Sequence, residues 1–195
     1  MSDGRAIPSA DRAADLALWI VVAAGCALFV LRPSLTGRAW TPQVLLAGYV
    51  MLGLVAASAP VAEATGRSMH PIVVAAAGVV AVVAAAVVAA AAAVGPSFPL
   101  PRTAEVLALN SVAAVAEELF FRRLTYGSLL RFGTLAAIVG SAVAFALVHV
   151  PIYGAAAIPV DLGAGLVFSW QRWASGGWGA PAATHVFANL VAVLR

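Results

Sequence analysis

The chain has 195 residues, of which 63% are hydrophobic and only 10% are charged. About a quarter of the residues of a soluble domain are charged, so this composition excludes a soluble enzyme and a disordered chain. A single cysteine excludes a disulfide scaffold, and the scattered arginines that give a net charge of +3 form no nucleic-acid-binding patch.

Five stretches contain no Asp, Glu, Lys or Arg, namely residues 16–31, 39–62, 68–101, 132–160 and 173–194. Apolar runs of about 18 or more residues are typical of membrane spans. These runs lack the two-residue alternation of barrel strands, so we expect helices. The sequence therefore predicts an all-α polytopic integral membrane protein with about seven (six to eight) transmembrane helices, at residues 14–31, 42–60, 71–94, 103–121, 132–150, 155–171 and 178–194.

The polar side chains divide the chain unevenly. The first three predicted helices carry almost none, whereas the last four carry nearly all of them. This asymmetry predicts an N-terminal, lipid-facing anchor half, residues 1–102, and a functional half, residues 103–195. The positive-inside rule favours a cytoplasmic N-terminus, because seven arginines then lie inside and four outside. The alanine-rich, lysine-free composition favours a bacterial inner membrane.

Ionisable and polar groups gather in or beside the last four predicted spans. An ionisable side chain within a span costs about 2.5–3.5 kcal/mol on insertion scales, so several together predict a functional cavity. These candidate residues are Glu117, Glu118, Arg122, His149, Asp161, His185 and Asn189. Asp161 has three interpretations: it could cap a helix, pair with an arginine or line the cavity.

The two adjacent glutamates are expected to play different parts. Glu118 and Arg122 are four residues apart, so they share a helix face and can form an ion pair. Glu117 is turned by about 100° and is free to face a cavity. Adjacent carboxylates in an apolar setting repel each other and lose hydration, which suits one of them to act as a general base. The alternative is a helix end at which acids and arginines meet the lipid headgroups.

Two further pairs have helical spacing. Phe145 lies one turn before His149, and His185 lies one turn before Asn189. Together with the glutamates, these groups could bind a water, polarise a carbonyl or hold a metal.

Three motifs in this order, Glu-Glu-x-x-x-Arg at 117–122, Phe-x-x-x-His at 145–149 and His-x-x-x-Asn at 185–189, resemble those of one family. It is the CPBP intramembrane proteases, also called the Abi or type II CAAX prenyl endopeptidase family, and the resemblance covers residues 103–195. The resemblance implies an all-helical membrane endopeptidase of about eight helices with its cavity in the bilayer. It implies that Glu117 activates the attacking water and that His149, His185 and Asn189 bind water and stabilise the oxyanion. Glu118, Arg122 and Phe145 would support the site.

The resemblance leaves the cofactor open, because the family has been described both as metalloproteases and as metal-free glutamate proteases. The options are no cofactor or a divalent metal such as zinc, for which Glu117, His149 and His185 are the candidate ligands. The chain has no His-Glu-x-x-His motif, and asparagine is a poor zinc ligand. The expected partners are a membrane-associated protein or peptide substrate and the lipid bilayer, with no nucleic acid.

Two other functions stay open at this point. One is a transporter or proton-coupled binding protein that uses the buried glutamates and histidines, and the other is a catalytically inactive membrane scaffold.

The protease hypothesis makes a geometric demand. The fourth and fifth spans run in opposite directions, so Glu117 can meet His149 only if the fourth helix continues through Arg122, with Arg122 and Arg123 snorkelling or paired. A helix that stops at Phe121, with Glu117 more than about 10 Å from His149, would refute the site.

Overall fold

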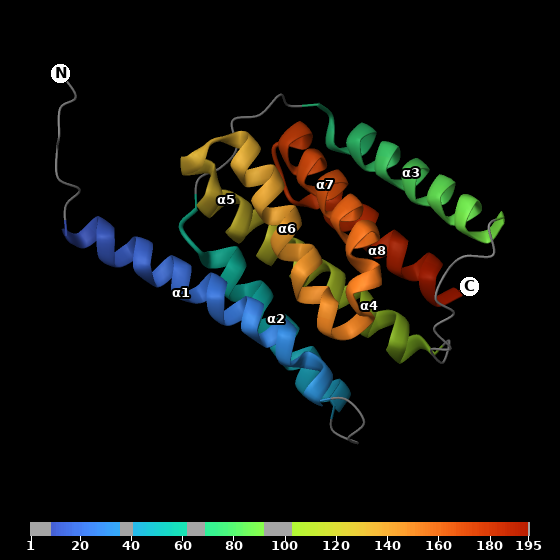
Figure 1. Cartoon of the computed structure of the whole chain (residues 1–195), viewed down its shortest axis with the longest axis horizontal. Helices are drawn as coiled ribbons and strands as arrows, with labels where there is room; N and C mark the ends of the chain where they lie inside the picture. Colours follow the sequence, from blue (N-terminus) through green and yellow to red (C-terminus); the bar gives the residue numbers. More distant parts are fainter. Residues whose placement is uncertain (1–8, 36–40, 62–68, 92–102, 195) are drawn as a thin grey trace.

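The computed structural model describes residues 9–35, 41–61, 69–91 and 103–194, and every regular element in these ranges is helical (Figure 1). Helices α1 (Ser9–Leu31), α2 (Thr41–Ser58) and α3 (Pro71–Ala91) come first. Helix α4 (Ala104–Glu118) continues through a π-helical segment (Leu119–Thr125) into α5 (Tyr126–Leu129). Helices α6 (Thr134–Tyr153), α7 (Ile158–Ser175) and α8 (Gly179–Leu194) complete the chain. The all-α prediction is confirmed.

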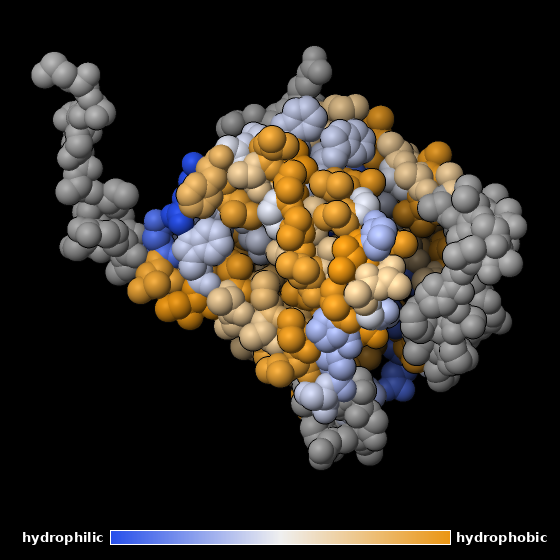
Figure 2. Space-filling view, viewed as in Figure 1, coloured by the Kyte–Doolittle hydropathy of each residue, from blue (hydrophilic) through white to orange (hydrophobic). Residues whose placement is uncertain are grey.

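Three helices in the described part of the chain are long and apolar enough to cross a membrane. They are Ala14–Ser34, Thr41–Ser58 and Thr134–Tyr153, and shorter apolar helices cover Pro71–Ala84 and Gly179–Val193. Large apolar side chains are exposed on the outside, among them Leu135 at 74% and Val160 at 73%, and they colour much of the visible surface (Figure 2). Such a surface fits a lipid environment.

Most predicted helix boundaries agree with the structure to within a few residues. The first helix begins at Ser9 and not at residue 14, and the fourth continues past residue 121 to Leu129. Two further differences concern the third and fifth spans. The third predicted span runs to residue 94, and its end lies outside the described residues. The fifth was predicted to end at residue 150, before Pro151, but α6 continues to Tyr153 with Pro151 inside its last turn. It ends at Gly154, whose φ of +80° is a conformation that glycine adopts without steric cost.

The core joins the N-terminal helices to the rest of the molecule. The Phe29 ring on α1 lies 5.6 Å from the Phe120 ring and 5.4 Å from the Phe121 ring, both in the π-helical segment. Tyr49 and Leu52 on α2 belong to the same buried cluster. Helices α1 and α2 therefore pack directly against the segment that follows the two glutamates.

Helix α3 packs on the opposite side of the molecule, along α7 and α8 (Figure 1). The buried Gln171 side chain donates hydrogen bonds to the carbonyl of Val74, at 2.9 Å, and to the hydroxyl of Thr184, at 2.8 Å. Gly78 makes this close approach possible, because a Cβ atom there would lie 2.1 Å from Gln171 Nε2.

Candidate active site

The fourth helix continues past Arg122, as the sequence predicts. Residues 104–129 form one composite helix, and Glu117 lies near its middle. Immediately after the glutamates, the helix widens into the π-helical segment, a distortion that is frequent at functional sites. Two of its carbonyls accept hydrogen bonds from other helices: Ser141 Oγ donates to Phe121 at 2.7 Å, and Arg172 Nε donates to Arg122 at 2.9 Å.

Glu117 lies at the meeting point of three helices and is 4% exposed. Its Oε2 atom lies 3.6 Å from His149 Nε2 on α6 and 3.8 Å from His185 Nε2 on α8. The predicted contact between Glu117 and His149 is therefore present. Both separations are too long for a direct hydrogen bond but within the reach of one water molecule.

Glu118 is bound from two sides instead. Its Oε2 lies 3.2 Å from Arg122 Nε, in an ion pair whose two side chains are completely buried. Its Oε1 lies 2.9 Å from His185 Nδ1. Arg122 also donates a 2.8 Å hydrogen bond to Ser141 Oγ. Arg123 donates to the carbonyls of Ala56 and Ala59, so both arginines are paired with protein groups.

The hydrogen bonds of the two histidines fix their neutral tautomers. His149 Nδ1 lies 2.7 Å from the carbonyl oxygen of Phe145, which can only accept. His185 Nδ1 faces the carboxylate of Glu118, whose other oxygen is paired with Arg122. In the neutral form, each imidazole therefore carries its hydrogen on Nδ1 and presents the lone pair of Nε2 to Glu117.

Two aromatic rings lie close to both Arg122 and the histidines. The Phe145 ring lies 4.5 Å from the His149 ring and 5.7 Å from the His185 ring, and the Phe168 ring stacks on His185 at 4.9 Å. The Arg122 guanidinium lies 5.0 Å from the centre of the Phe145 ring and 5.6 Å from that of the Phe168 ring, within the range of cation–π attraction. These rings restrict the orientation of both histidines.

Two predicted candidates lie at the edge of this cluster. Asn189 is part-buried, and its side-chain amide donates a 3.3 Å hydrogen bond to the backbone carbonyl of Asn110. Asp161 is close enough to interact electrostatically with His149, Glu117 and His185. Its Oδ2 atom is buried and has no hydrogen-bond partner among the described residues. Asp161 therefore lies near this cluster, and none of the described arginines is its partner.

Sequence reasoning missed Arg32, which was assigned to a loop beyond the first span. It begins the 3-10 turn Arg32–Leu35 at the end of α1, and its Nη1 atom lies 3.9 Å from Glu117 Oε1. The guanidinium also lies 5.7 Å from the centre of the Tyr49 ring on α2. A charged residue directly after an apolar run was the only available signal.

The described donor atoms are not arranged as a metal centre. Among the residues that the structure describes, no three His, Cys, Asp or Glu side chains are arranged to hold a metal ion. The second glutamate is already held by Arg122 and His185. The arrangement offers a carboxylate and two imidazole lone pairs that can hold and deprotonate a water molecule.

Residues 99–191 match the family model of the type II CAAX prenyl endopeptidases, described as Rce1-like. This segment is an Rce1-like domain. It contains all three motifs. It also contains Glu117 and its neighbours His149 and His185, but not Arg32. The resemblance inferred from the motifs is therefore confirmed. The comparisons with curated proteins and with solved structures gave no match.

Proposed function

We propose that the protein is an intramembrane endopeptidase that hydrolyses a peptide bond of a membrane-associated protein or peptide. The observation that carries the proposal is the position of Glu117. It is a buried carboxylate in an Rce1-like domain, and two imidazole nitrogens lie 3.6 Å and 3.8 Å from the same oxygen. A water placed among these three atoms would have acceptors for both of its protons.

In the proposed reaction, Glu117 removes a proton from this water, and the water oxygen bonds to the carbonyl carbon of the substrate. The lone pair of one imidazole Nε2, on His149 or His185, accepts a hydrogen bond from the second proton of the water. The tetrahedral intermediate then collapses, the C–N bond breaks, and Glu117 returns the proton to the leaving amine. Glu118 and Arg122 keep His185 in position, and Phe145 does so for His149 through its carbonyl. No step requires a metal.

The direct test is Glu117→Gln in protein reconstituted into lipid nanodiscs with a library of membrane-anchored peptides. Loss of a general base lowers rates by roughly 10²–10⁴, so we expect cleavage products to disappear from the mass spectra. Glu105→Gln is the matched control, because Glu105 is exposed in the first turn of the same helix. Unchanged cleavage by the Glu117→Gln variant would refute the proposal.

A chelator separates the two mechanistic classes. Since the described residues build no metal centre, we expect dialysis against a chelator to leave cleavage unchanged. Activity that is lost on chelation and restored by zinc would instead make Glu117, His149 and His185 metal ligands. Proton-coupled uptake into liposomes without any cleavage would favour a transporter.

We further propose seven spans in a bacterial inner membrane, with the N-terminus in the cytoplasm. The excess of arginine on that side supports this orientation. Reporter fusions at both termini test it, because an odd number of spans puts the two ends on opposite sides.

A further inference from the structure

The first turn of α7 contributes an acid that the proposed reaction does not use. Asp161 is half-buried, and its Oδ2 atom is buried without a hydrogen-bond partner among the described residues. The N-cap of α7 is Ala157, so Asp161 does not cap the helix, and none of the described arginines is its partner. Buried polar atoms are nearly always hydrogen-bonded, so this oxygen points to a group that binds beside it.

Three partly exposed residues lie near the buried Glu117, and we call Arg32, Tyr153 and Asp161 the rim of the site. Tyr153 ends α6 and stacks on His149, with the ring centres 5.8 Å apart. It is close enough to Arg32, Glu117 and Asp161 to interact electrostatically with all three. The exposed fractions are 42% for Tyr153 and 23% for the Arg32 side chain, against 4% for Glu117, so a substrate reaches the carboxylate past the rim.

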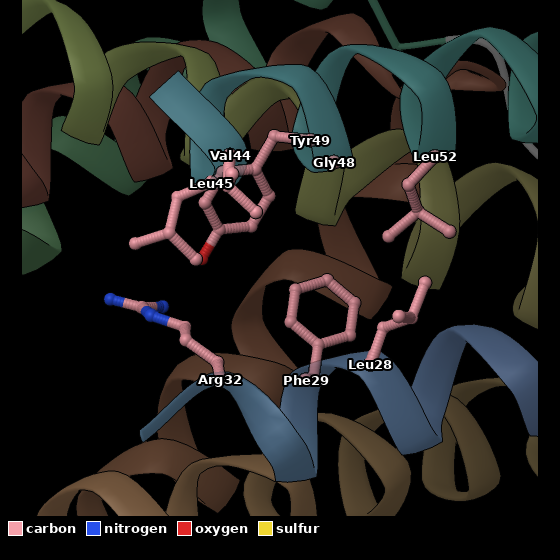
Figure 3. A pocket seen from close by; sticks show the side chains of 8 residues that line it. All are labelled: Leu28, Phe29, Arg32, Val44, Leu45, Gly48, Tyr49 and Leu52. Atoms are coloured by element: carbon pink, nitrogen blue, oxygen red, sulfur yellow. The ribbon is translucent and has the colours of Figure 1, made fainter. Parts of the chain in front are cut away.

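The rim carries charges of both signs. Figure 3 shows the Arg32 side chain extending from the end of α1 toward Tyr49 on α2, and its Nη1 atom lies 3.9 Å from Glu117 Oε1. Asp161 lies within electrostatic range of Glu117 and of both imidazoles. A substrate that reaches Glu117 therefore meets a cation and an anion at the rim.

One group of the substrate becomes a cation in the proposed reaction. Glu117 takes a proton from the water and returns it to the nitrogen as the C–N bond breaks, which yields an amine and a carboxylic acid. The proton of that acid then passes through Glu117 to the amine, so the products are a carboxylate and an ammonium. The nitrogen must lie within hydrogen-bond reach of Glu117 to receive its proton, which brings the ammonium into the range of Asp161.

We propose that Asp161 binds the amino group of the departing peptide fragment. The proposal rests on the proposed function. The Asp161 carboxylate accepts hydrogen bonds from the new ammonium and takes no proton itself. Its place in the first turn of α7 favours the negative charge, because the positive end of the helix dipole lies there. Glu118 is unsuited to this part, since Arg122 and His185 already hold it at 3.2 Å and 2.9 Å.

The surroundings favour the leaving amino group over a basic side chain of the substrate. Val160, the neighbour of Asp161, is 73% exposed on the apolar surface, so a substrate approaches through lipid. A lysine or arginine side chain would have to carry its charge into that environment, which is costly. The ammonium forms only after cleavage, within range of Asp161, and every peptide bond yields one.

The first test measures binding in lipid nanodiscs, with Glu117→Gln in every protein so that cleavage is absent and a second carboxylate is removed. The probes are Ala-Val-Leu amide with a free amino group and its N-acetylated form. A hydrogen bond to a charged group changes Kd by about 10–100-fold, so we expect the free amine to bind tighter by that factor. Adding Asp161→Asn should abolish this preference, and Asp161→Glu should retain part of it.

Glu105→Gln in the same background is the matched control. Glu105 is also an acid in the first turn of a helix, but it is exposed and lies twelve residues before Glu117. The acetylated probe reports on folding, because it should bind all variants equally. A preference for the free amine that survives Asp161→Asn overturns the proposal, and so does an equal loss in Glu105→Gln.

The second test measures cleavage by proteins that retain Glu117. We expect Asp161→Asn to lower kcat about tenfold and to weaken inhibition by the free-amine probe but not by the acetylated one. An effect confined to the pH profile would mean that Asp161 only tunes the histidines. A lost preference for cleavage beside lysine, with inhibition by the free-amine probe unchanged, would mean that it binds a basic side chain. Either result overturns the proposal.

The outcomes separate this inference from the proposed function. If Glu117→Gln is inactive while Asp161→Asn still prefers the free amine, this inference fails and the proposed function survives. If Glu117→Gln cleaves normally, the proposed function itself fails.

Discussion

Glu118 and Arg122 form an ion pair that is closed to solvent, and its removal is a quantitative test of the structure. The Oε2–Nε distance is 3.2 Å, and neither side chain has any exposed surface. Glu118→Gln keeps the shape of the side chain but removes the charge, which leaves the guanidinium buried without its nearest counter-charge.

The expected magnitude follows from this distance and burial. With an effective dielectric constant of about 20, Coulomb's law gives about 5 kcal/mol for two unit charges at this separation. Deleting one partner of a buried pair typically destabilises a protein by about 3–5 kcal/mol. We therefore expect Glu118→Gln to lower the free energy of unfolding by about 3–5 kcal/mol.

The assay is reversible unfolding in detergent micelles, with a double-mutant cycle that adds Arg122→Met and the double variant. The double variant should lose less stability than the sum of the two single losses, because neither charge is then left alone. Asp15→Asn is the control, since it removes an ion pair with Arg131 whose side chains are 50% and 40% exposed. Exposed pairs contribute at most about 1 kcal/mol. A Glu118→Gln loss no larger than that of Asp15→Asn, or strict additivity in the cycle, would refute the reasoning.

Two further substitutions test the packing around the site. Gly78→Ala should lower the free energy of unfolding by about 1–3 kcal/mol, because its Cβ would lie 2.1 Å from Gln171 Nε2. Gly48→Ala is the control in the same thermal scans, and it should not destabilise the protein because a Cβ there would meet no atom within 4 Å. Ser141→Ala should cost about 1–3 kcal/mol, because it removes a hydrogen-bond partner of the buried Arg122, and a wild-type melting temperature would contradict the assigned bond.

The positions of the helices were predictable because their signals are local. Long uncharged runs ending near Gly, Pro or Arg locate the described helices to within a few residues. The contact between Glu117 and His149 was also predictable, since opposed helices bring these residues together only if the fourth helix continues through Arg122. Pro151 misled the prediction of one boundary, because a proline is tolerated in the last turn of α6.

The residues that were missed depend on tertiary packing. Arg32, Ser141 and Arg172 join the site or its support from three different helices, and periodicity does not reveal which helix ends converge. The π-helical segment has no propensity signature either. Its carbonyls are held by Ser141 and Arg172, which lie 20 and 50 residues further along the chain from the residues they bind.

Four of the seven predicted spans are not among the three described helices of sufficient length and apolarity, and buried charges bear on two of them, the composite helix and α7. Hydropathy scores composition, whereas the cost of a charge in a membrane depends on what surrounds it. Glu118 and Arg122 in the composite helix have no exposed surface, and Arg172 in α7 is 2% exposed. These charges contact protein and not lipid, so their helices can lie in the membrane although their composition argues against it.

Two neighbouring glutamates therefore differ in what surrounds them. Glu118 is held at 2.9 Å and 3.2 Å by His185 and Arg122, which leaves it little freedom to move. The recorded contacts of Glu117 to His149, His185 and Arg32 are all between 3.6 Å and 3.9 Å, too long for direct hydrogen bonds. A buried carboxylate with partners at this spacing is incompletely bound, and its partners are within the reach of one bridging water. Substitutions at position 118 should act first on stability, whereas those at position 117 should act first on activity.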